Sequence, residues 1–310
     1  MLGNLMVNIV AEAVDAESSR TSQSTTRDEL NLTSSTMPNL NSRKRKLGYF
    51  QFCLNFAREL WEFRHALITL TSNKLAKRYQ RSVLGFAWSL LNPLLTTLSL
   101  TIIFSLLFSR DPKSYGAFIV SGILAWSFIR DTLCAGCISI IDSANFHRKM
   151  RIPKSFFPSV TVATEFTNFV LSLLSMSALV VGLGIPMHAT LLLLPVAMAI
   201  TTVFVFGLTM ILAIATIYFR DLSHIVNLVI GTLFYFTPIF YSLDQVPEKV
   251  KVFFLLNPFY YFVNLFKHLI YYGTIPSLFE WSIAAFIAFG TLIVSLFVLR
   301  SKENDIVFRL

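Results

Sequence analysis

Cys134 and Cys137 have the C-x-x-C spacing found in redox-active and zinc-binding motifs. A zinc site needs further ligands, but the sequence has no second cysteine pair and no histidine cluster near them. Both cysteines lie in an apolar stretch beside Ala135 and Gly136, where small side chains let neighbouring helices approach closely. We therefore expect helix packing here, and neither a metal nor a redox site.

Three ionisable residues interrupt long apolar stretches: Arg130, Asp131 and Glu165. A charge in such surroundings usually faces a partner or a water-filled path. Because Arg130 and Asp131 are neighbours, a helix points their side chains about 100° apart, and we do not expect them to pair with each other. They either line a path for a polar substrate or contact neighbouring helices and lipid headgroups. Glu165 lies about two turns after Pro158, so it either lines that path or extends to the membrane surface.

Lys77, Arg78 and Arg81 stand just before the first long apolar run. Arginine binds phosphate oxygens through two parallel bonds, so these residues suit the phosphate of an arriving lipid. General attraction to anionic headgroups explains them equally well.

Motifs for catalysis are lacking. We find no acidic D-x-D motif, no serine elbow and no G-x-x-x-x-G-K-[ST] phosphate loop. We therefore expect no catalytic residue, no metal and no bound cofactor. The chain therefore lacks the ATP site that the phosphate loop would supply.

The composition indicates a membrane protein. Of 310 residues, 55% are hydrophobic and 14% are charged, whereas a soluble domain has roughly 25% charged residues. The run from Ser82 to Ser109 has no charged side chain and exceeds the roughly 20 residues that a spanning helix needs. The net charge of +9 fits basic cytoplasmic loops better than nucleic-acid binding.

The pattern predicts an all-α integral membrane protein of the inner (plasma) membrane. We expect six transmembrane helices, at 83–108, 116–141, 160–185, 191–217, 224–243 and 279–299. The loop 142–159 between the second and third spans is strongly basic, which places it and both termini on the cytoplasmic side.

The part before the first span divides in two. Residues 1–46 are rich in Ser, Thr and Asn and end in a basic cluster, so we expect a disordered basic extension. Residues 47–82 contain an amphipathic helix that we place in the membrane interface, followed by a basic connection at 74–81. The apolar face of that helix comprises Phe52, Phe56, Leu60, Phe63, Leu67 and Leu70. Residues 83–310 form the transmembrane domain.

Prolines interrupt residues 246–276, at Pro247, Asn257-Pro258 and Pro276. What remains is two apolar helices of roughly 9 and 14 residues, too short to cross lipid. We predict a re-entrant helical hairpin between spans five and six, on the outer side. The aromatic residues clustered at this outer end, both before and within the hairpin, either form an interfacial belt or line a path on which sugar faces stack. They include Tyr235, Phe236, Phe240 and Tyr241.

Several motifs in order resemble the membrane subunits of type-two ABC exporters, in the branch that exports O-antigen, capsule or teichoic-acid polymers. The resemblance covers roughly four fifths of the chain, from about Leu60 onward. The motifs are Arg78-Tyr79 through Ser82-Val83-Leu84-Gly85, then Trp88 and Asn92-Pro93-Leu94; Lys149 through Phe157-Pro158; Tyr218-Phe219-Arg220-Asp221; Thr237-Pro238-Ile239-Phe240-Tyr241; Val246-Pro247; and Leu256-Asn257-Pro258.

The resemblance implies a homodimer with a pathway between protomers, bound to two ABC ATPase subunits that hold ATP and Mg²⁺. It implies that a lipid-linked polysaccharide is the substrate and that the cytoplasmic loops dock in the ATPase. The implied docking residues are Arg148, Lys149, Arg151, Lys154, Arg220 and Asp221. The sequence leaves open two alternatives: an integral-membrane polyprenyl-phosphate glycosyltransferase, or an ABC exporter of a different lipid or small molecule. A gradient-driven carrier predicts internal repeats, and we detect none.

Overall fold

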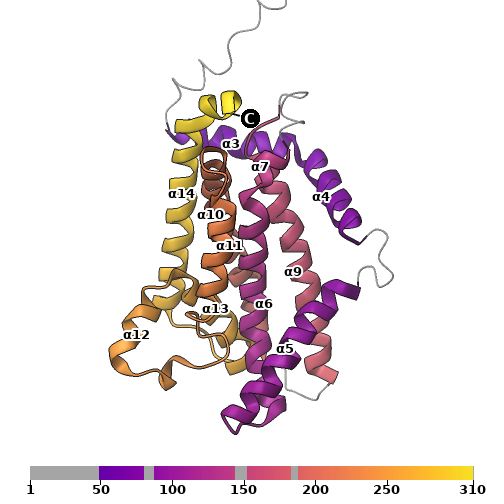
Figure 1. The fold of residues 1–310 in the computed structure, drawn as a ribbon, viewed down its shortest axis with the longest axis vertical. Coiled ribbons are helices and arrows are strands. Elements are labelled where there is room, and N and C mark those ends of the chain that lie inside the picture. Colours follow the sequence, from indigo (N-terminus) through magenta and orange to yellow (C-terminus); the bar gives the residue numbers. More distant parts are fainter. Residues whose placement is uncertain (1–48, 80–86, 144–151, 183–187, 310) are drawn as a thin grey trace, which may run out of the picture. The chain divides into compact units, whose positions relative to one another are not determined.

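The computed structural model describes residues 49–79, 87–143, 152–182 and 188–309, and every regular element in these ranges is a helix (Figure 1). The all-helical class is therefore confirmed for these residues. In chain order the elements are α3 (Tyr49–Glu62), α4 (Arg64–Tyr79), α5 (Ala87–Leu107), α6 (Pro112–Cys137), α7 (Ser139–Asp142), α9 (Phe156–Gly182), η1 (Ala189–Leu193), α10 (Leu194–Tyr218), α11 (Leu222–Leu233), η2 (Leu243–Gln245), α12 (Glu248–Leu255), α13 (Pro258–Lys267), η3 (His268–Tyr272) and α14 (Leu278–Arg309).

The chain divides into two units, residues 1–57 and 58–310. In the first unit only the beginning of α3 is described, and the expected extension 1–46 lies outside the described residues. The packing below is that of the second unit.

Helix α6 is the buried centre of that unit. Asp111 caps it by accepting the N–H of Ser114 at 2.9 Å, and Pro112 follows in the first turn, where its missing N–H costs nothing. Most of the helix after its first turn is buried, including Ile119 and Ile129, which are fully enclosed. In Figure 1, α6 lies between α9 and α10, and it also contacts α5 and α13. A side chain on α6 can therefore face several other helices.

Among the described residues, four helices are long and apolar enough to cross a membrane: Pro112–Cys137, Phe156–Ser177, Ala189–Tyr218 and Leu278–Lys302. They overlap four of the six expected spans. Two further apolar helices, Pro93–Leu107 and Leu222–Leu233, are shorter. The six-span count stays a prediction.

The fifth expected span, 224–243, is helical only in its first half. Helix α11 ends at Leu233, after 12 residues, and the chain then turns through Thr237 and Pro238. Proline lacks the N–H that would continue the helix and disfavours helical backbone at the preceding residue. A helix of 12 residues rises only about 18 Å, which is less than the roughly 30 Å of hydrocarbon.

Helices α10 and α14 lie side by side in a close seam (Figure 1). At Gly207 a Cβ atom would stand 2.8 Å from the backbone of Thr291 and Leu292. The glycine therefore permits a backbone approach that any larger residue would prevent.

The segment 246–276 contains the two expected short helices, α12 and α13, the second extended by η3. Pro247 precedes α12, and Asn257 caps α13 by accepting the N–H of Phe259 at 3.0 Å, with Pro258 in the first turn. Gly273 ends η3 with a left-handed φ of 63°. The helices of the predicted hairpin are thus present, and their depth in a membrane stays a prediction.

The region before the first span differs from the expectation in two ways. The amphipathic helix is two helices, α3 and α4, separated at Phe63. Residues 74–79 of the expected basic connection belong to α4, because Lys, Leu, Ala and Arg all favour helix. Lys77 and Arg78 are therefore helical, whereas Arg81 lies outside the described residues.

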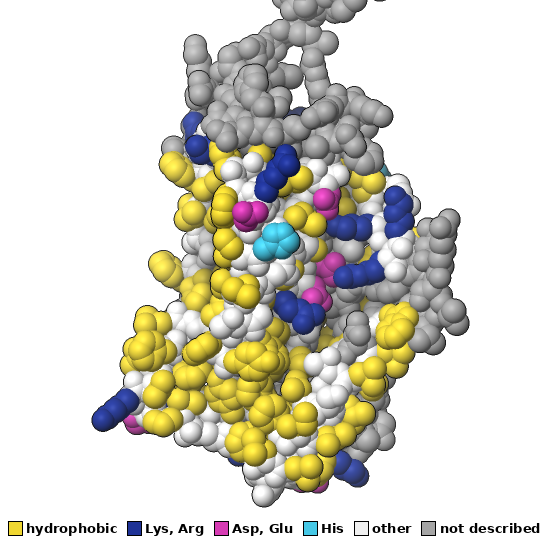
Figure 2. Space-filling model, in the orientation of Figure 1, with side chains coloured by type: hydrophobic (Ala, Val, Ile, Leu, Met, Phe, Trp, Pro, Cys, Tyr) yellow, Lys and Arg dark blue, Asp and Glu magenta, His cyan; other side chains and the backbone are white. Residues whose placement is uncertain are grey.

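The surface of the second unit is strongly apolar over much of its height. Figure 2 shows one face on which apolar side chains cover most of the lower half, while most charged side chains gather in the upper half. Exposed apolar residues include Leu98 and Leu106 on α5, and Phe286 and Ile293 on α14. Such a surface suits contact with lipid chains.

Candidate functional site: a cavity lined by two ion pairs

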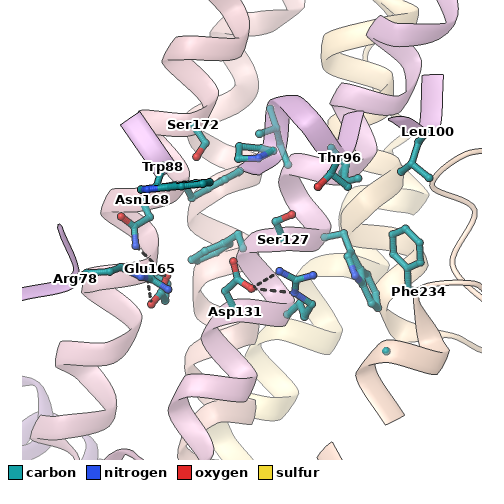
Figure 3. Close-up of a pocket in the computed structure, with 18 of the residues that line it drawn as sticks. Arg78, Trp88, Thr96, Leu100, Ser127, Asp131, Glu165, Asn168, Ser172 and Phe234 are labelled. Carbon is teal, nitrogen blue, oxygen red and sulfur yellow. Dashed lines mark hydrogen bonds and ion pairs between the residues drawn. The ribbon is translucent and has the colours of Figure 1, made fainter. Parts of the chain in front are cut away.

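A cavity of about 650 Å³ opens between α4, α5, α6, α9 and α11. Four charged side chains reach it: Arg78, Arg130, Asp131 and Glu165. Figure 3 shows Arg78 meeting Glu165 on one wall, while Asp131 points into the same space from α6. The other polar lining residues are Thr96, Ser127, Asn168 and Ser172.

Arg78, at the end of α4, binds Glu165 on α9. Its Nη1 donates to both carboxylate oxygens, at 3.0 Å and 2.9 Å. The side chain of Glu165 is 5% exposed and that of Arg78 is 46% exposed. Asn168, one turn further along α9, donates to the same carboxylate at 3.0 Å. Glu165 therefore faces this cavity, and its place on a substrate path stays a prediction.

The contact at Arg78 is the last of a series along α4 and α9. One turn earlier, Lys74 donates to Thr161 at 2.9 Å, so the two helices run in the same direction. Partial burial lowers the pKa of Lys74, and the carboxylates of Glu165 and Asp142 act against that shift.

Nearer its beginning, α4 rests on apolar side chains of α9. Phe63, Leu67 and Leu70 pack against a buried cluster that includes Phe156 and Phe157. Half of the amphipathic face that we assigned to lipid therefore covers protein.

The prediction that Arg130 and Asp131 do not pair is wrong. Arg130 donates to Asp131 from Nε at 2.9 Å, and its Nη2 lies 2.8 Å from the same oxygen. The backbone directions diverge by about 100°, but the arginine side chain is long enough to fold back along the cavity wall. The side chains are 52% and 37% exposed, so the pair is open to the cavity.

Aromatic rings form much of the remaining wall. They come from α5, α6, α9 and the end of α11: Trp88, Trp126, Phe128, Phe169, Phe234 and Tyr235. Trp126 packs edge-on against Phe259 of α13, and Phe128 stacks on Phe169, with ring centres 4.8 Å apart. The cavity thus combines fixed charges with flat apolar faces.

Of the aromatic residues proposed for a substrate path, the structure brings only Tyr235 to this cavity. Phe236 is exposed elsewhere. Phe240 is buried and stacks on Phe104, with ring centres 4.5 Å apart, and Tyr241 donates its hydroxyl to the carbonyl of Tyr235 at 2.9 Å. These last two side chains stabilise the turn after α11.

The remaining basic candidates lie apart from the cavity. Lys77 is exposed on α4, Lys154 precedes α9, and Arg220 and Asp221 are exposed between α10 and α11. Arg148, Lys149 and Arg151 lie outside the described residues.

The cysteine pair lies where close packing was expected. Cys137 is buried and Cys134 is partly buried, and a Cβ at the intervening Gly136 would stand 2.2 Å from Thr209 of α10. Within the described ranges, no three His, Cys, Asp or Glu residues lie close enough to hold a metal ion.

A polar stripe on α9 is a further signal for this cavity, and we did not predict it. Thr161, Glu165, Asn168 and Ser172 are spaced four, three and four residues apart in an apolar helix. That spacing places them on one face of α9. The last three line the cavity, and the first receives Lys74.

Comparison with known proteins gives one matching family and several relatives. The family described as "ABC-2 type transporter" matches residues 65–271. The chain is 32% identical over 227 residues to an O-antigen export system permease protein RfbA of Myxococcus xanthus, covering 72% of this chain and 86% of that protein.

Two further relatives extend the comparison. An RfbA protein of Klebsiella pneumoniae, with the same description, is 31% identical over 193 residues, which are 62% of this chain and 74% of that protein. The capsule polysaccharide export inner-membrane protein CtrC of Neisseria meningitidis is 20% identical over 202 residues, which are 64% of this chain and 76% of that protein.

Proposed function

The chain belongs to the ABC-2 type transporter family, and from this premise we propose that it is the transmembrane permease subunit of a polysaccharide exporter. It moves a lipid-linked polysaccharide from the cytoplasmic side across the inner membrane. The relatives named for O-antigen and capsule export support this substrate class. They disfavour a glycosyltransferase and an exporter of unrelated small molecules.

The observation that carries the proposal is the composition of the cavity. A lipid-linked polysaccharide has two chemically different parts, an anionic phosphate linkage and a chain of sugar rings. Arg78 and Arg130 offer cations for the first part. Rings such as Trp88, Trp126 and Tyr235 offer flat faces on which sugars stack.

Substrate access is assigned to the end of α4. Lys77 and Arg78 belong to its last turn, and Arg81 follows shortly in the sequence. A phosphate at the depth of the cytoplasmic headgroups meets these cations first. The side chain of Arg78 also lines the cavity, and Arg130 and Asp131 lie on the opposite wall.

A separate ABC ATPase supplies the energy, because this sequence has no phosphate-binding loop. Two copies of that partner, holding ATP and Mg²⁺, bind a homodimer of this chain. The basic loop with Arg148, Lys149, Arg151 and Lys154 docks in the partner, together with Arg220 and Asp221 between α10 and α11. The chain itself binds no cofactor.

In the membrane the permease has six spans and cytoplasmic termini. Helix α11 covers only part of the fifth span, and the turn that follows it completes the span, because non-helical backbone is tolerated where protein surrounds it and Thr237 and Ile239 are buried. Helices α12 and α13 enter and leave from the outer side. The strongly apolar surfaces of α5 and α14 support contact with lipid.

A deletion strain tests the proposal. Cells lacking the chain should lose the polymer from their surface and accumulate lipid-linked glycan inside, measured by immunoblotting of surface and internal fractions. Normal surface polymer in that strain would overturn the proposed function.

Complementation then tests the cavity. Trp88→Ala removes a cavity ring and should lower surface polymer several-fold at equal protein level, because stacking on an aromatic side chain contributes about 1–3 kcal/mol for each nucleic-acid base and we expect a similar order for a sugar face. Trp61→Ala is the matched control, since Trp61 is 69% exposed on α3 and does not line the cavity. Equal export by both variants would remove the cavity from the pathway.

A further inference from the structure

Both arginines of the cavity are bound by carboxylates of the same chain. Arg78 binds Glu165, and Arg130 binds Asp131. The formal charges of these four lining residues therefore cancel. The described lining therefore carries no net formal charge and does not by itself concentrate anions, so an arriving phosphate must take an arginine from its carboxylate.

The Arg78–Glu165 pair has the geometry for such an exchange. The carboxylate is almost fully buried, whereas nearly half of the arginine side chain is exposed. Both bonds to Glu165 come from a single nitrogen, Nη1. Because nearly half of the arginine side chain is exposed at the cavity, a phosphate can approach Arg78 while the arginine still contacts Glu165.

The surroundings keep the change local. Lys74 holds α4 one turn earlier through Thr161, and Phe63 and Leu67 anchor its beginning on α9. Asn168 continues to donate to Glu165 when Arg78 turns away. Only the last turn of α4 needs to move, and the buried carboxylate keeps a hydrogen-bond partner.

We propose that Glu165 competes with the phosphate of the substrate for Arg78 and thereby sets the affinity of the cavity for phosphate-bearing lipids. Glu165 is a positioning residue that acts through Arg78 and does not itself bind the substrate. In the empty cavity it holds the guanidinium at the wall, and a bound phosphate replaces it. This inference rests on the proposed function, because that function supplies the phosphate.

Binding of a short probe tests the competition. The full chain is placed in nanodiscs of phosphatidylcholine, and the Kd for radiolabelled farnesyl diphosphate is measured. Glu165→Gln removes the competing charge while preserving side-chain size, and it should tighten binding about five- to tenfold. Arg78→Gln should weaken binding about tenfold.

The double variant separates competition from a general change in charge. With Arg78 absent there is nothing to release, so Glu165→Gln combined with Arg78→Gln should bind no more tightly than Arg78→Gln alone. Tightening by Glu165→Gln in the Arg78→Gln background would overturn the proposal. An unchanged or weaker Kd for Glu165→Gln alone would overturn it as well.

Four controls define the ligand and the fold. Glu248→Gln breaks a different ion pair, between Glu248 and Lys251 on exposed α12, and should leave the Kd unchanged. Farnesol, which lacks the diphosphate, should not displace farnesyl diphosphate. If inorganic diphosphate displaces it as well as unlabelled farnesyl diphosphate does, the ligand is a free anion and the assignment to a lipid is overturned. Glu165→Asp retains the charge but shortens the reach to Arg78, so it should tighten binding about twofold even if Glu165→Gln folds poorly; an unchanged or weaker Kd would count against competition.

The binding experiment and the deletion strain test the two proposals separately, because farnesyl diphosphate carries no glycan. Loss of the expected Kd pattern refutes the role of Glu165, even if the deletion strain loses its surface polymer. Normal surface polymer in the deletion strain refutes the proposed function, even if the Kd pattern is found.

Discussion

Two basic side chains of this protein donate hydrogen bonds to different kinds of oxygen. Arg78, at the cavity, donates to a carboxylate, whereas Lys267, in the hairpin, donates to main-chain carbonyls. Lys267 is 4% exposed and donates to the carbonyls of Pro238 and Tyr241. Its Nζ also lies 3.8 Å from the centre of the Phe118 ring. Arg78 is half-exposed on the wall of a cavity.

The difference separates a fixed cation from an exchangeable one. No ligand can reach Lys267 without opening the packing of α6, α13 and the turn after α11, so this lysine joins those elements permanently. At the cavity, an anion from outside can replace the carboxylate. Similar residue types thus have different uses, which burial and the kind of oxygen partner decide.

The largest expected effect is at Lys267. Lys267→Glu would place a buried carboxylate against two carbonyl oxygens, and we expect it to destabilise the chain by at least about 3 kcal/mol. Thermal unfolding in detergent, followed by gel filtration, measures the loss. Lys249→Glu, on the exposed face of α12, is the control and should unfold like the wild type. A Lys267→Glu variant as stable as that control would show that the hairpin site is as open as the cavity.

A second contrast concerns two glycines. Gly207→Ala adds a methyl group against the backbone of α14, and we expect a loss of about 2 kcal/mol. Gly231, at the cavity, has nothing within 4 Å of its Cβ position, so Gly231→Ala should be neutral or stabilise by up to about 1 kcal/mol. Unfolding midpoints of both variants test this; equal losses would mean that the two sites are packed alike.

The cap of α13 is expected to have a smaller effect. Asn257 accepts from Phe259 and donates to Thr237 at 3.0 Å, so Asn257→Ala removes a cap and a tie to the turn after α11. We expect a loss of about 1–2 kcal/mol. Asn227→Ala, on exposed α11, removes only a bond to its own helix and serves as the comparison in the same unfolding assay. A cap that can be removed without loss would mean that the helices alone hold the hairpin.

The smallest effect is expected at the second ion pair of the cavity. Asp131→Asn releases Arg130, but Asp131 is 37% exposed and holds its arginine less firmly than Glu165 does. Stability should change by less than about 1 kcal/mol, and farnesyl diphosphate should bind about twofold more tightly. A larger gain than that of Glu165→Gln would make Arg130 the principal anion-binding residue.

Much of the fold was predictable because apolar length and proline position are local signals. Four of the expected spans overlap helices of sufficient length, and the prolines at 247 and 258 mark the beginnings of α12 and α13. The early end of α11 follows from Pro238, whose effect the high hydropathy of residues 224–243 concealed. Lys77 and Arg78 are helical because lysine and arginine have high helix propensity, although we had placed them in a connection because of their charge.

The site was predictable only in part. Arg130, Asp131 and Tyr235 were named and do line the cavity, but their partners depend on which helices meet. The pairing of Arg78 with Glu165 joins residues 87 positions apart in the sequence, and a pattern of neighbouring residues cannot predict a contact over that separation. The polar stripe on α9 is visible from spacing alone, whereas the fold of Arg130 back onto Asp131 depends on the shape of the cavity wall.

The parallel run of α4 along α9 has a mechanical consequence. Helix α9 carries two contacts with α4. One is at Phe156 and Phe157 and the other is at Glu165, about 13 Å further along the helix axis. The two helices are therefore in contact at both ends of this stretch. A displacement of the chain just before Phe156 would therefore be carried along α9 to Glu165, the partner of Arg78, without passing through the buried α6.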